Sequence, residues 1–384
     1  MVALVRRGAT LRAAAEECGV THPTVHLWVE RAGKKRLDRV DWSDGLPGRR
    51  EPVNRTATEM EDLVLTVRVD LREKSNLGEF GAAAILRELE ASGKKSLPSE
   101  RTIGRILERR GALDGRGRTC RPAPPPGWYL PDVAEARAEL DSFDFVEGLV
   151  IQGGPEVEVL NGMSLIGGLP VSWPSLAWTS RIAAKALIEH WGAVGCPQYA
   201  QFDNDTRFQG PHQYPDVIGR VSRVCLSLGV VPVFVPPREP GFQAAIENFN
   251  GRWQSKVWTR FHHESLRGLR KRSALYIEAF RTRAASRIEA APERIPIPGT
   301  WSLDLQAPPR GEIIYLRRTT EAGTAEVLGQ HFLVERTWVH RLVRAVVDLD
   351  QETISFYAMR RADPSNHRLI RTVSHRIPHR RFSE

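Results

Sequence analysis

The sequence predicts a chain of several domains: all-α units at the N-terminus, a mixed α/β sheet in the middle and a small all-β barrel at the C-terminus. Three observations predict this order. Helical periodicity interrupted by glycine dominates the first third of the chain, strand-like segments alternate with helices from residue 133, and short alternating strands return after residue 300. The length of 384 residues suits two to four domains, and 41% apolar residues suffice for buried cores.

Charge and cysteine content limit the function classes. With 55 Lys and Arg against 46 Asp and Glu, the formal net charge is +9, which favours a polyanionic partner. Charge alone fits a ribosome-associated protein equally well. The four cysteines lie far apart without a CxxC pair, so we expect neither a zinc knuckle nor a disulfide framework and interpret them as small core or loop residues. No segment resembles a signal peptide or a membrane span, so we expect a cytoplasmic protein.

Residues 1–40 contain two short helical patterns separated by Gly19, which is typical of a helix-turn-helix. Thr21 can cap the second helix, and Pro23 falls in its tolerant first turn. The expected shared core of the two helices is Ala15, Cys18, Val20, Val25 and Trp28. An ordinary helical hairpin is the alternative, but we favour DNA binding. The expected DNA-contacting residues near the start of the second helix are His22, Thr24 and His26.

Residues 57–114 form a second unit of this kind, which we expect to be winged-helix-like. Two apolar stripes predict its helices, and their members are Ile85, Leu86, Leu89, Ile103, Ile106 and Leu107. Ser99 is a plausible N-cap of the last helix. Two such units in tandem indicate an extended DNA footprint. The expected DNA contacts in this unit are Arg101, Thr102 and Arg105.

Four further segments follow. Residues 115–132 are rich in Gly, Pro and Arg and are interpreted as a linker. Residues 133–264 combine three strands with alternating helices and strands, as in a mixed α/β catalytic core. We expect residues 265–299 to form a basic helical connector; a run of charges on a helix usually marks a solvent-exposed face. Residues 300–384 are expected to form the small β-barrel.

In the stretch "YAQFDNDTRF", a predicted strand is followed directly by acidic residues. Asp203 should lie at the C-terminal edge of the sheet, where open α/β folds place their chemistry. In "FDFVEG", alternation sends Asp144 to the face opposite its aromatic neighbours. Asp141 is an odd number of residues from Asp144, so only one of the two can face a given site.

A long helix in "GFQAAIENFNGRWQSKVWTRF" offers the third carboxylate. Its buried stripe is Ile246, Phe249, Trp253 and Val257. Glu247 lies at the edge of this stripe, with Asn250 on the same side. We expect Asn250, Arg252 and Lys256 to contact DNA.

Three carboxylates from two strands and a helix make an oxygen-rich site suited to Mg²⁺, with Mn²⁺ as a substitute. Two such ions about 4 Å apart can stabilise the attacking and leaving oxygens of an in-line phosphoryl displacement. The acidic residues then hold metal between the protein and a DNA backbone, while the surrounding Arg and Lys hold the rest of the strand.

At these residues the chain resembles the DDE transposase and retroviral-type integrase superfamily, in particular bacterial insertion-sequence transposases with an integrase catalytic core. "SFDFVEG" looks like the first-aspartate strand, "YAQFDNDTRF" like the second, and "GFQAAIENFNGRWQ" like the glutamate helix. The resemblance covers nearly the whole chain and implies an RNase H-like core. It also implies that Asp144, Asp203 and Glu247 are the catalytic and metal-binding triad.

The chain departs from the family pattern in several places. Asp205 stands where glycine is common, so it either competes with Asp203 for metal or caps the next turn. "QGPHQYPD" looks like an added surface loop, and "LNGMS" replaces an aspartate-arginine-serine stretch, which removes an acidic residue. We also expect the start at "MVALVRRG" to be truncated, because little precedes the first helix.

The resemblance implies metal-dependent cleavage at the ends of an insertion sequence, followed by strand transfer into target DNA. We therefore expect double-stranded DNA as partner, a homo-oligomer assembled on it, and a bacterial cytoplasmic, nucleoid-associated location. Two alternatives remain: a DNA-binding regulator or domesticated transposase without turnover, and a structure-selective nuclease of the RNase H type. The helix-turn-helix pair disfavours the nuclease, because it implies recognition of duplex sequence.

Overall fold

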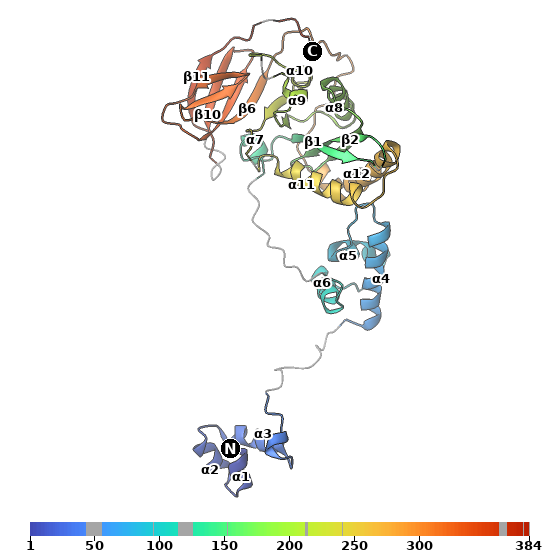
Figure 1. Cartoon of the computed structure of the whole chain (residues 1–384), viewed down its shortest axis with the longest axis vertical. Coiled ribbons are helices and arrows are strands. Elements are labelled where there is room, and N and C mark those ends of the chain that lie inside the picture. Colours follow the sequence, from blue (N-terminus) through green and yellow to red (C-terminus); the bar gives the residue numbers. More distant parts are fainter. Residues whose placement is uncertain are drawn as a thin grey trace. The chain divides into compact units, whose positions relative to one another are not determined.

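The computed structural model describes residues 1–43, 56–94, 96–113, 126–151, 153–211, 214–239, 241–360, 367–378 and 380–383. It divides into two compact units, Met1–Leu63 and Val64–Glu384. Figure 1 shows the whole chain, coloured along the sequence. No helix in these ranges is both long enough and apolar enough to cross a membrane.

The first unit is helical. Its elements are α1 (Val2–Arg6), α2 (Leu11–Glu17), α3 (His22–Ala32) and a 3₁₀ turn at Leu37–Arg39. Gly19 has φ +63°, a left-handed conformation that suits glycine and turns the chain between α2 and α3. Ala14, Ala15 and Val25 are buried between these helices. Cys18 is exposed, so its predicted core position is wrong, because α2 ends at Glu17 and Cys18 already belongs to the turn.

Three more helices precede the sheet: α4 (Thr58–Lys74), α5 (Ala82–Ala91) and α6 (Glu100–Arg109). The buried side chains of α5 and α6 are Ala84, Ile85, Leu89, Ile103, Ile106 and Leu107. The Ser99 Oγ accepts a hydrogen bond from the Thr102 backbone N–H at 3.3 Å, so the predicted N-cap is confirmed. Most of the predicted linker lies outside the described residues.

A nine-stranded mixed sheet organises the rest of the second unit, in the order β11-β10-β9-β6-β5-β4-β1-β2-β3. The strands are β1 (Leu140–Val150), β2 (Glu156–Ser164), β3 (Pro170–Ser175), β4 (Tyr199–Phe202), β5 (Val231–Phe234), β6 (Glu312–Arg318), β9 (Leu342–Asp348), β10 (Thr353–Ala358) and β11 (Leu369–Ser374). The β1–β2–β3 pairs are antiparallel, and β1, β4, β5 and β6 run parallel. A separate hairpin joins β7 (Thr324–Val327) to β8 (Gln330–Leu333).

Helices cover both faces of this sheet (Figure 1). They are α7 (Pro131–Ala134), α8 (Ser180–Val194), α9 (Thr206–Gln209), α10 (Arg220–Ser227), α11 (Ala244–Trp253) with a π-helical turn at Gln254–Trp258, and α12 (Leu266–Glu289). On one face, Trp191 of α8 and Val221 of α10 share a core with Phe143 of β1. On the other, Phe249 of α11 packs with Val146 of β1. The two cores hold β1 between them.

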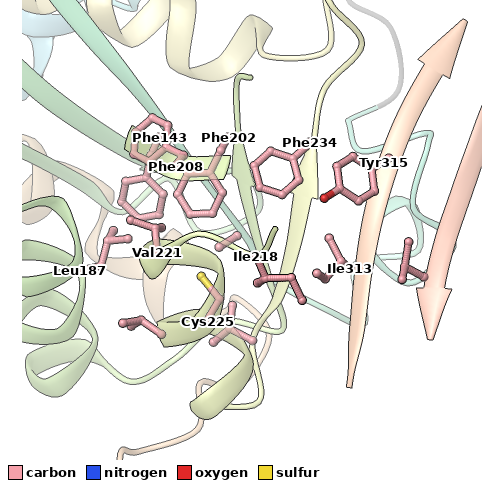
Figure 2. Close-up of a cluster of buried hydrophobic side chains, with 14 of the residues drawn as sticks. Phe143, Leu187, Phe202, Phe208, Ile218, Val221, Cys225, Phe234, Ile313 and Tyr315 are labelled. Atoms are coloured by element: carbon pink, nitrogen blue, oxygen red, sulfur yellow. The ribbon is translucent and has the colours of Figure 1, made fainter. Parts of the chain in front are cut away.

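The structure corrects the prediction of a separate C-terminal barrel. The strands from β6 onward extend the central sheet, because β6 pairs in parallel with β5 through Val233–Ile314 and Phe234–Tyr315. A row of aromatic rings crosses this junction (Figure 2), with centroid distances of 5.7 Å for Phe143–Phe202, 6.1 Å for Phe202–Phe234 and 5.2 Å for Phe234–Tyr315. Without β6, the β5 edge would expose unpaired backbone groups. One continuous core therefore spans the predicted boundary at residue 300.

The basic segment 265–299 is also more than a connector. Its helix α12 buries Leu269, Tyr276 and Phe280, and Phe280 meets the Phe249 ring at 5.9 Å. Three of its arginines bond to backbone carbonyls of the β2–β3 hairpin and its flanks: Arg270 to Pro174, Arg281 to Pro170, and Arg287 to Leu165 and Ile166. These cations anchor α12 to the sheet.

Candidate active site

Asp144 lies in the middle of β1 and faces α11. Alternation along the strand places Phe143 in the core beneath α8, and Asp144 on the opposite side. There the Asp144 Oδ2 accepts a hydrogen bond of 2.7 Å from the Asn250 Nδ2 of α11. This bond ties the first predicted carboxylate to the helix that carries the third.

Asp203 directly follows β4, next to Asp144. The parallel register pairs Leu140 with Tyr199 and Ser142 with Gln201, and its continuation sets Asp203 beside Asp144. The Asp203 Oδ1 accepts the backbone N–H of Asp205 at 3.1 Å, which fixes the turn after the strand.

Asn204 anchors the same turn from the other side. Its Nδ2 donates to the Val235 carbonyl at 2.8 Å, and its Oδ1 accepts from the Arg317 Nη2 at 2.8 Å. Arg317 is buried, and it also donates to the carbonyls of Phe234 and Val235. Asn204 and Arg317 thus hold the Asp203 turn against the end of β5.

Glu247 lies in the first turn of α11 and is exposed. Asn250 follows three residues later, so the two side chains share one face of the helix. Gln243, the N-cap residue of α11, donates through Nε2 to the Phe143 carbonyl at 3.4 Å. This contact holds the start of the helix against β1, beside Asp144.

Asp203 and Glu247 act electrostatically on Asp144. Burial raises the pKa of Asp144 to about 6, and the negative charges of Asp203 and Glu247 add to this rise against the Asn250 hydrogen bond. Burial also raises the pKa of Asp203, helped by the Asp205 charge and opposed by the Asp205 N–H and by Arg207. At both aspartates, burial and neighbouring negative charge therefore outweigh the interactions that lower the pKa.

The donor chemistry of this cluster fits a hard cation. Carboxylate oxygens are the ligands that Mg²⁺ and Mn²⁺ prefer, and a dication would relieve the repulsion between Asp144 and Asp203. As they stand, the described residues contain no group of three or more His, Cys, Asp or Glu side chains close enough to hold a metal ion.

Asp141, the rival of Asp144, belongs to a different environment. It is buried, and it accepts hydrogen bonds from the Arg294 Nη2 at 2.5 Å, the Ser164 Oγ at 2.6 Å and the Trp191 Nε1 at 3.0 Å. Burial alone would raise the pKa of Asp141, but the Arg294 guanidinium lowers it below the usual range. Asp141 lies on the α8 side of β1, opposite Asp144, as alternation predicts.

Asp205 caps α9. It accepts the Arg207 backbone N–H at 2.7 Å and the Arg207 Nε at 2.9 Å through Oδ1. Arg207 also donates to Glu158 of β2 at 3.0 Å and to Glu147 of β1 at 2.5 Å, with its guanidinium carbon 3.7 Å from the centre of the Phe145 ring. Of the two roles that the sequence left open for Asp205, these contacts match the cap.

Asn161 is the residue of this site that sequence reasoning missed. It pairs directly with Asp144 across β1 and β2, is fully buried, and donates through Nδ2 to the Asn250 Oδ1 at 2.8 Å. A relay Asn161–Asn250–Asp144 thus joins two strands and α11. In the sequence, the stretch "LNGMS" was notable only because it lacks an acidic residue. The position of its asparagine opposite Asp144 depends on the strand register, which the sequence does not reveal.

The three side chains of the core that were predicted to contact DNA contact other protein residues in this structure. Asn250 is buried and bonded to Asp144 rather than open to a ligand. The Arg252 guanidinium stacks on the Phe280 ring at 5.3 Å, and the Lys256 Nζ lies 5.6 Å from the centre of the Phe80 ring. In this structure these three side chains face protein.

The helical units present the other predicted DNA contacts. His22 and His26 are exposed on α3, and Arg101 and Arg105 are exposed on α6. Thr24 and Thr102 are half-buried and bond to the cap residues of their own helices, Thr21 at 2.8 Å and Ser99 at 3.0 Å. Four of the six side chains are thus open to a ligand.

No family model and no curated protein matches the chain. Solved structures that match include a chain of the simian T-cell lymphotropic virus intasome in complex with a PP2A regulatory subunit, at 14% identity, TM-score 0.32, 69% of this chain and 84% of that chain. The HTLV-2 integrase catalytic core in complex with magnesium matches at 13% identity and TM-score 0.27, over 37% of this chain and 83% of that chain. The BIV integrase catalytic core matches at 14% identity and TM-score 0.26, over 37% and 81%.

Proposed function

We propose that the chain is a DDE-type transposase, which cleaves the ends of an insertion sequence and joins them to target DNA with the help of Mg²⁺ or Mn²⁺. The observation that carries this proposal is the pairing of neighbouring carboxylates on two strands, Asp144 on β1 and Asp203 after β4, next to a helix that bonds to Asp144 through Asn250 and carries Glu247 on the same face. The strand order β3-β2-β1-β4-β5 with α8 and α10 between the strands supports an RNase H-like core.

Asp144, Asp203 and Glu247 would hold the metal, which neutralises phosphate charge and activates the attacking hydroxyl or water when bound. The chain's own residues supply position. Asn161 and Asn250 orient the Asp144 carboxylate, and the turn after β4 holds Asp203 at the edge of the sheet. Such fixed geometry is what an in-line displacement needs, because misplaced groups lose most of the advantage of proximity.

The helical units at 1–40 and 57–114 would bind the element ends, through exposed side chains such as His26 and Arg105. Because both ends must be held together, we propose a homo-oligomer on double-stranded DNA. A bacterial, nucleoid-associated location would follow from that substrate.

A cleavage and strand-transfer assay tests the proposal. Purified protein is mixed with labelled duplexes from the DNA that flanks its gene, with Mg²⁺, with Mn²⁺ or with chelator. We expect metal-dependent nicking and joining in the parent. Asp203→Asn and Glu247→Gln should each lower the rate more than about 100-fold, because each removes a proposed metal ligand.

The matched control is Glu189→Gln, an exposed carboxylate of α8 on the opposite face of the sheet, which should react like the parent. DNA binding is measured for every variant. Nicking without joining would favour the nuclease alternative, and tight binding of verified element ends without any cleavage would favour the regulator.

A further inference from the structure

A groove lies between the loop that precedes α11 and the C-terminal strands. It has a volume of about 840 Å³, and its lining includes Phe242, Arg318, Trp338, Arg341, Arg360 and Arg368. Four guanidinium groups thus surround one concave surface. Its lining includes no residue of the carboxylate cluster or of the two helical units.

The groove carries excess positive charge. Arg318 pairs with Glu239, and Arg368 with Glu335 at 3.6 Å, so two of the four arginines have a carboxylate partner. Arg341 and Arg360 are exposed, and neither makes an ion pair within the described part of the chain. Among the described residues, two guanidinium groups of the groove thus have no carboxylate partner and are open to an anion.

Trp338 holds two of these guanidinium groups in place. The Arg341 and Arg368 guanidinium carbons lie 4.7 Å and 5.6 Å from the centre of the Trp338 ring. Thr319 fixes the backbone at Arg341: the Thr319 N–H donates to the Arg341 carbonyl at 2.9 Å, and the Thr319 Oγ1 accepts the Arg341 N–H at 3.0 Å. Guanidinium groups held in this way lose little entropy when they bind phosphate.

The opposite wall of the groove leads to the carboxylates. Glu239, Gly241 and Phe242 line it, and the next residue, Gln243, bonds to the Phe143 carbonyl beside Asp144. The Tyr129 hydroxyl donates to the Phe242 carbonyl at 3.0 Å, which keeps this wall close to the core. A chain of phosphates that passes the carboxylate site and follows this wall would meet the arginines that line the rest of the groove.

We propose that this groove binds the phosphodiester backbone of the DNA strand that leaves the carboxylate site, with Arg341 and Arg360 as phosphate contacts. The inference rests on the proposed function for the identity of its ligand. Charge complementarity favours this occupant, because guanidinium groups bind phosphates without reading the bases. The groove thus positions the strand and contributes no sequence specificity.

The test is the affinity of the full chain for a fluorescein-labelled duplex of the flanking DNA, measured by anisotropy over a salt series without divalent metal. The variant is Arg341→Glu with Arg360→Glu. We expect binding about tenfold weaker, and a slope of log K against log salt that is smaller by about 2, since two phosphate contacts are lost.

The matched control is Arg310→Glu with Arg371→Glu, which makes the same charge change at exposed positions outside the groove. Equal weakening by both double variants would overturn the proposal, because net charge alone would then explain it. Arg341→Gln with Arg360→Gln serves if the glutamate variant fails to fold, with a smaller loss in the same direction.

The outcomes separate this inference from the proposed function. If the groove variant loses affinity while the parent shows no cleavage, the inference that the groove binds DNA backbone is supported and the transposase proposal fails. If Asp203→Asn abolishes cleavage while the groove variant binds and cleaves like the parent, the transposase proposal stands and the groove inference fails.

Discussion

Asp141 and Asp144 occupy the same strand, β1, and face opposite sides of the sheet. Asp141 is buried against Arg294, Ser164 and Trp191, which all donate to its oxygens. Asp144 accepts a side-chain hydrogen bond from Asn250 and lies close enough to Asp203 and Glu247 for their charges to raise its pKa. One strand thus carries a fully paired carboxylate on one face and an uncompensated one on the other.

The difference teaches how the two kinds of acidic residue can be told apart. Burial raises the pKa of both carboxyl groups, but Arg294 reverses the effect at Asp141, while two neighbouring carboxylates reinforce it at Asp144. A paired carboxylate stabilises the fold. A carboxylate held close to other anions destabilises the fold unless a cation is bound, and such destabilising arrangements are typical of functional sites.

The largest expected effect comes from breaking the paired side. Asp141→Asn should lower the free energy of unfolding by about 3–5 kcal/mol, because it leaves the largely buried Arg294 charge without its carboxylate partner. Urea denaturation followed by tryptophan fluorescence measures the loss, since Trp191 contacts Asp141 directly. Cleavage per folded molecule should remain close to that of the parent.

Two comparisons sharpen this result. Glu189→Gln removes an exposed carboxylate of α8 and should change stability by less than about 0.5 kcal/mol. Asp141→Asn combined with Arg294→Met should recover part of the loss, because no charge stays unpaired. A loss below about 1 kcal/mol in Asp141→Asn alone would show that the pairing contributes little.

The opposite side should respond with the opposite sign. A rise of the Asp144 pKa from 3.8 to about 6 corresponds to a cost of about 3 kcal/mol once the group ionises in the folded state. Asp144→Asn should therefore stabilise the metal-free protein by up to this amount at pH 7. At pH 3.5 it should have almost no effect.

The sign follows from proton linkage. With its raised pKa the folded state holds the Asp144 proton more tightly than the unfolded state, so stability falls as pH rises from about 4 to about 6. For Asp141, whose pKa is lowered, the stabilisation is present above pH 3.8 and is lost as pH falls. Thermal melts of parent and Asp144→Asn in chelator, from pH 3.5 to 7.5, measure the difference; a constant difference across this range would contradict the assignment.

Local patterns were sufficient to predict much of this comparison. Alternation along β1 predicted that Asp141 and Asp144 face apart, and helical spacing predicted that Glu247 and Asn250 share a face. The strand that ends before Asp203 could likewise be read from its apolar run and the acidic turn after it. Each of these inferences depends on neighbours within a few residues.

The features that sequence could not reveal depend on partners far along the chain. Nothing in the alternation of 312–318 indicates that β6 pairs with β5 rather than within a barrel. The register that sets Asn161 opposite Asp144, and the reach of Arg294 to Asp141, are equally remote in sequence. Cys18 shows the same limit on a smaller scale, since one residue decides whether it ends a helix or begins a turn.

The smallest expected effect concerns the relay behind Asp144. Asn161→Ala removes the donor to the Asn250 Oδ1, so the Asn250 amide is freer to turn away from the Asp144 Oδ2. We expect the Mg²⁺ concentration needed for half-maximal cleavage to rise about tenfold, as when groups that orient a metal ligand are lost. The readout is the Mg²⁺ dependence of cleavage, with stability measured in parallel.

Ser172→Ala is the matched control, because Ser172 pairs with Asn161 on the next strand and bonds to Ser273 rather than to the relay. It should leave the Mg²⁺ dependence unchanged. If Asn161 acts through Asn250, then Asn250→Ala should shift the Mg²⁺ dependence at least as far, and adding Asn161→Ala to it should shift the dependence no further. Additive shifts would mean that Asn161 supports the fold around β2 rather than the orientation of Asp144. Asn250 would then orient the Asp144 carboxylate without help from Asn161.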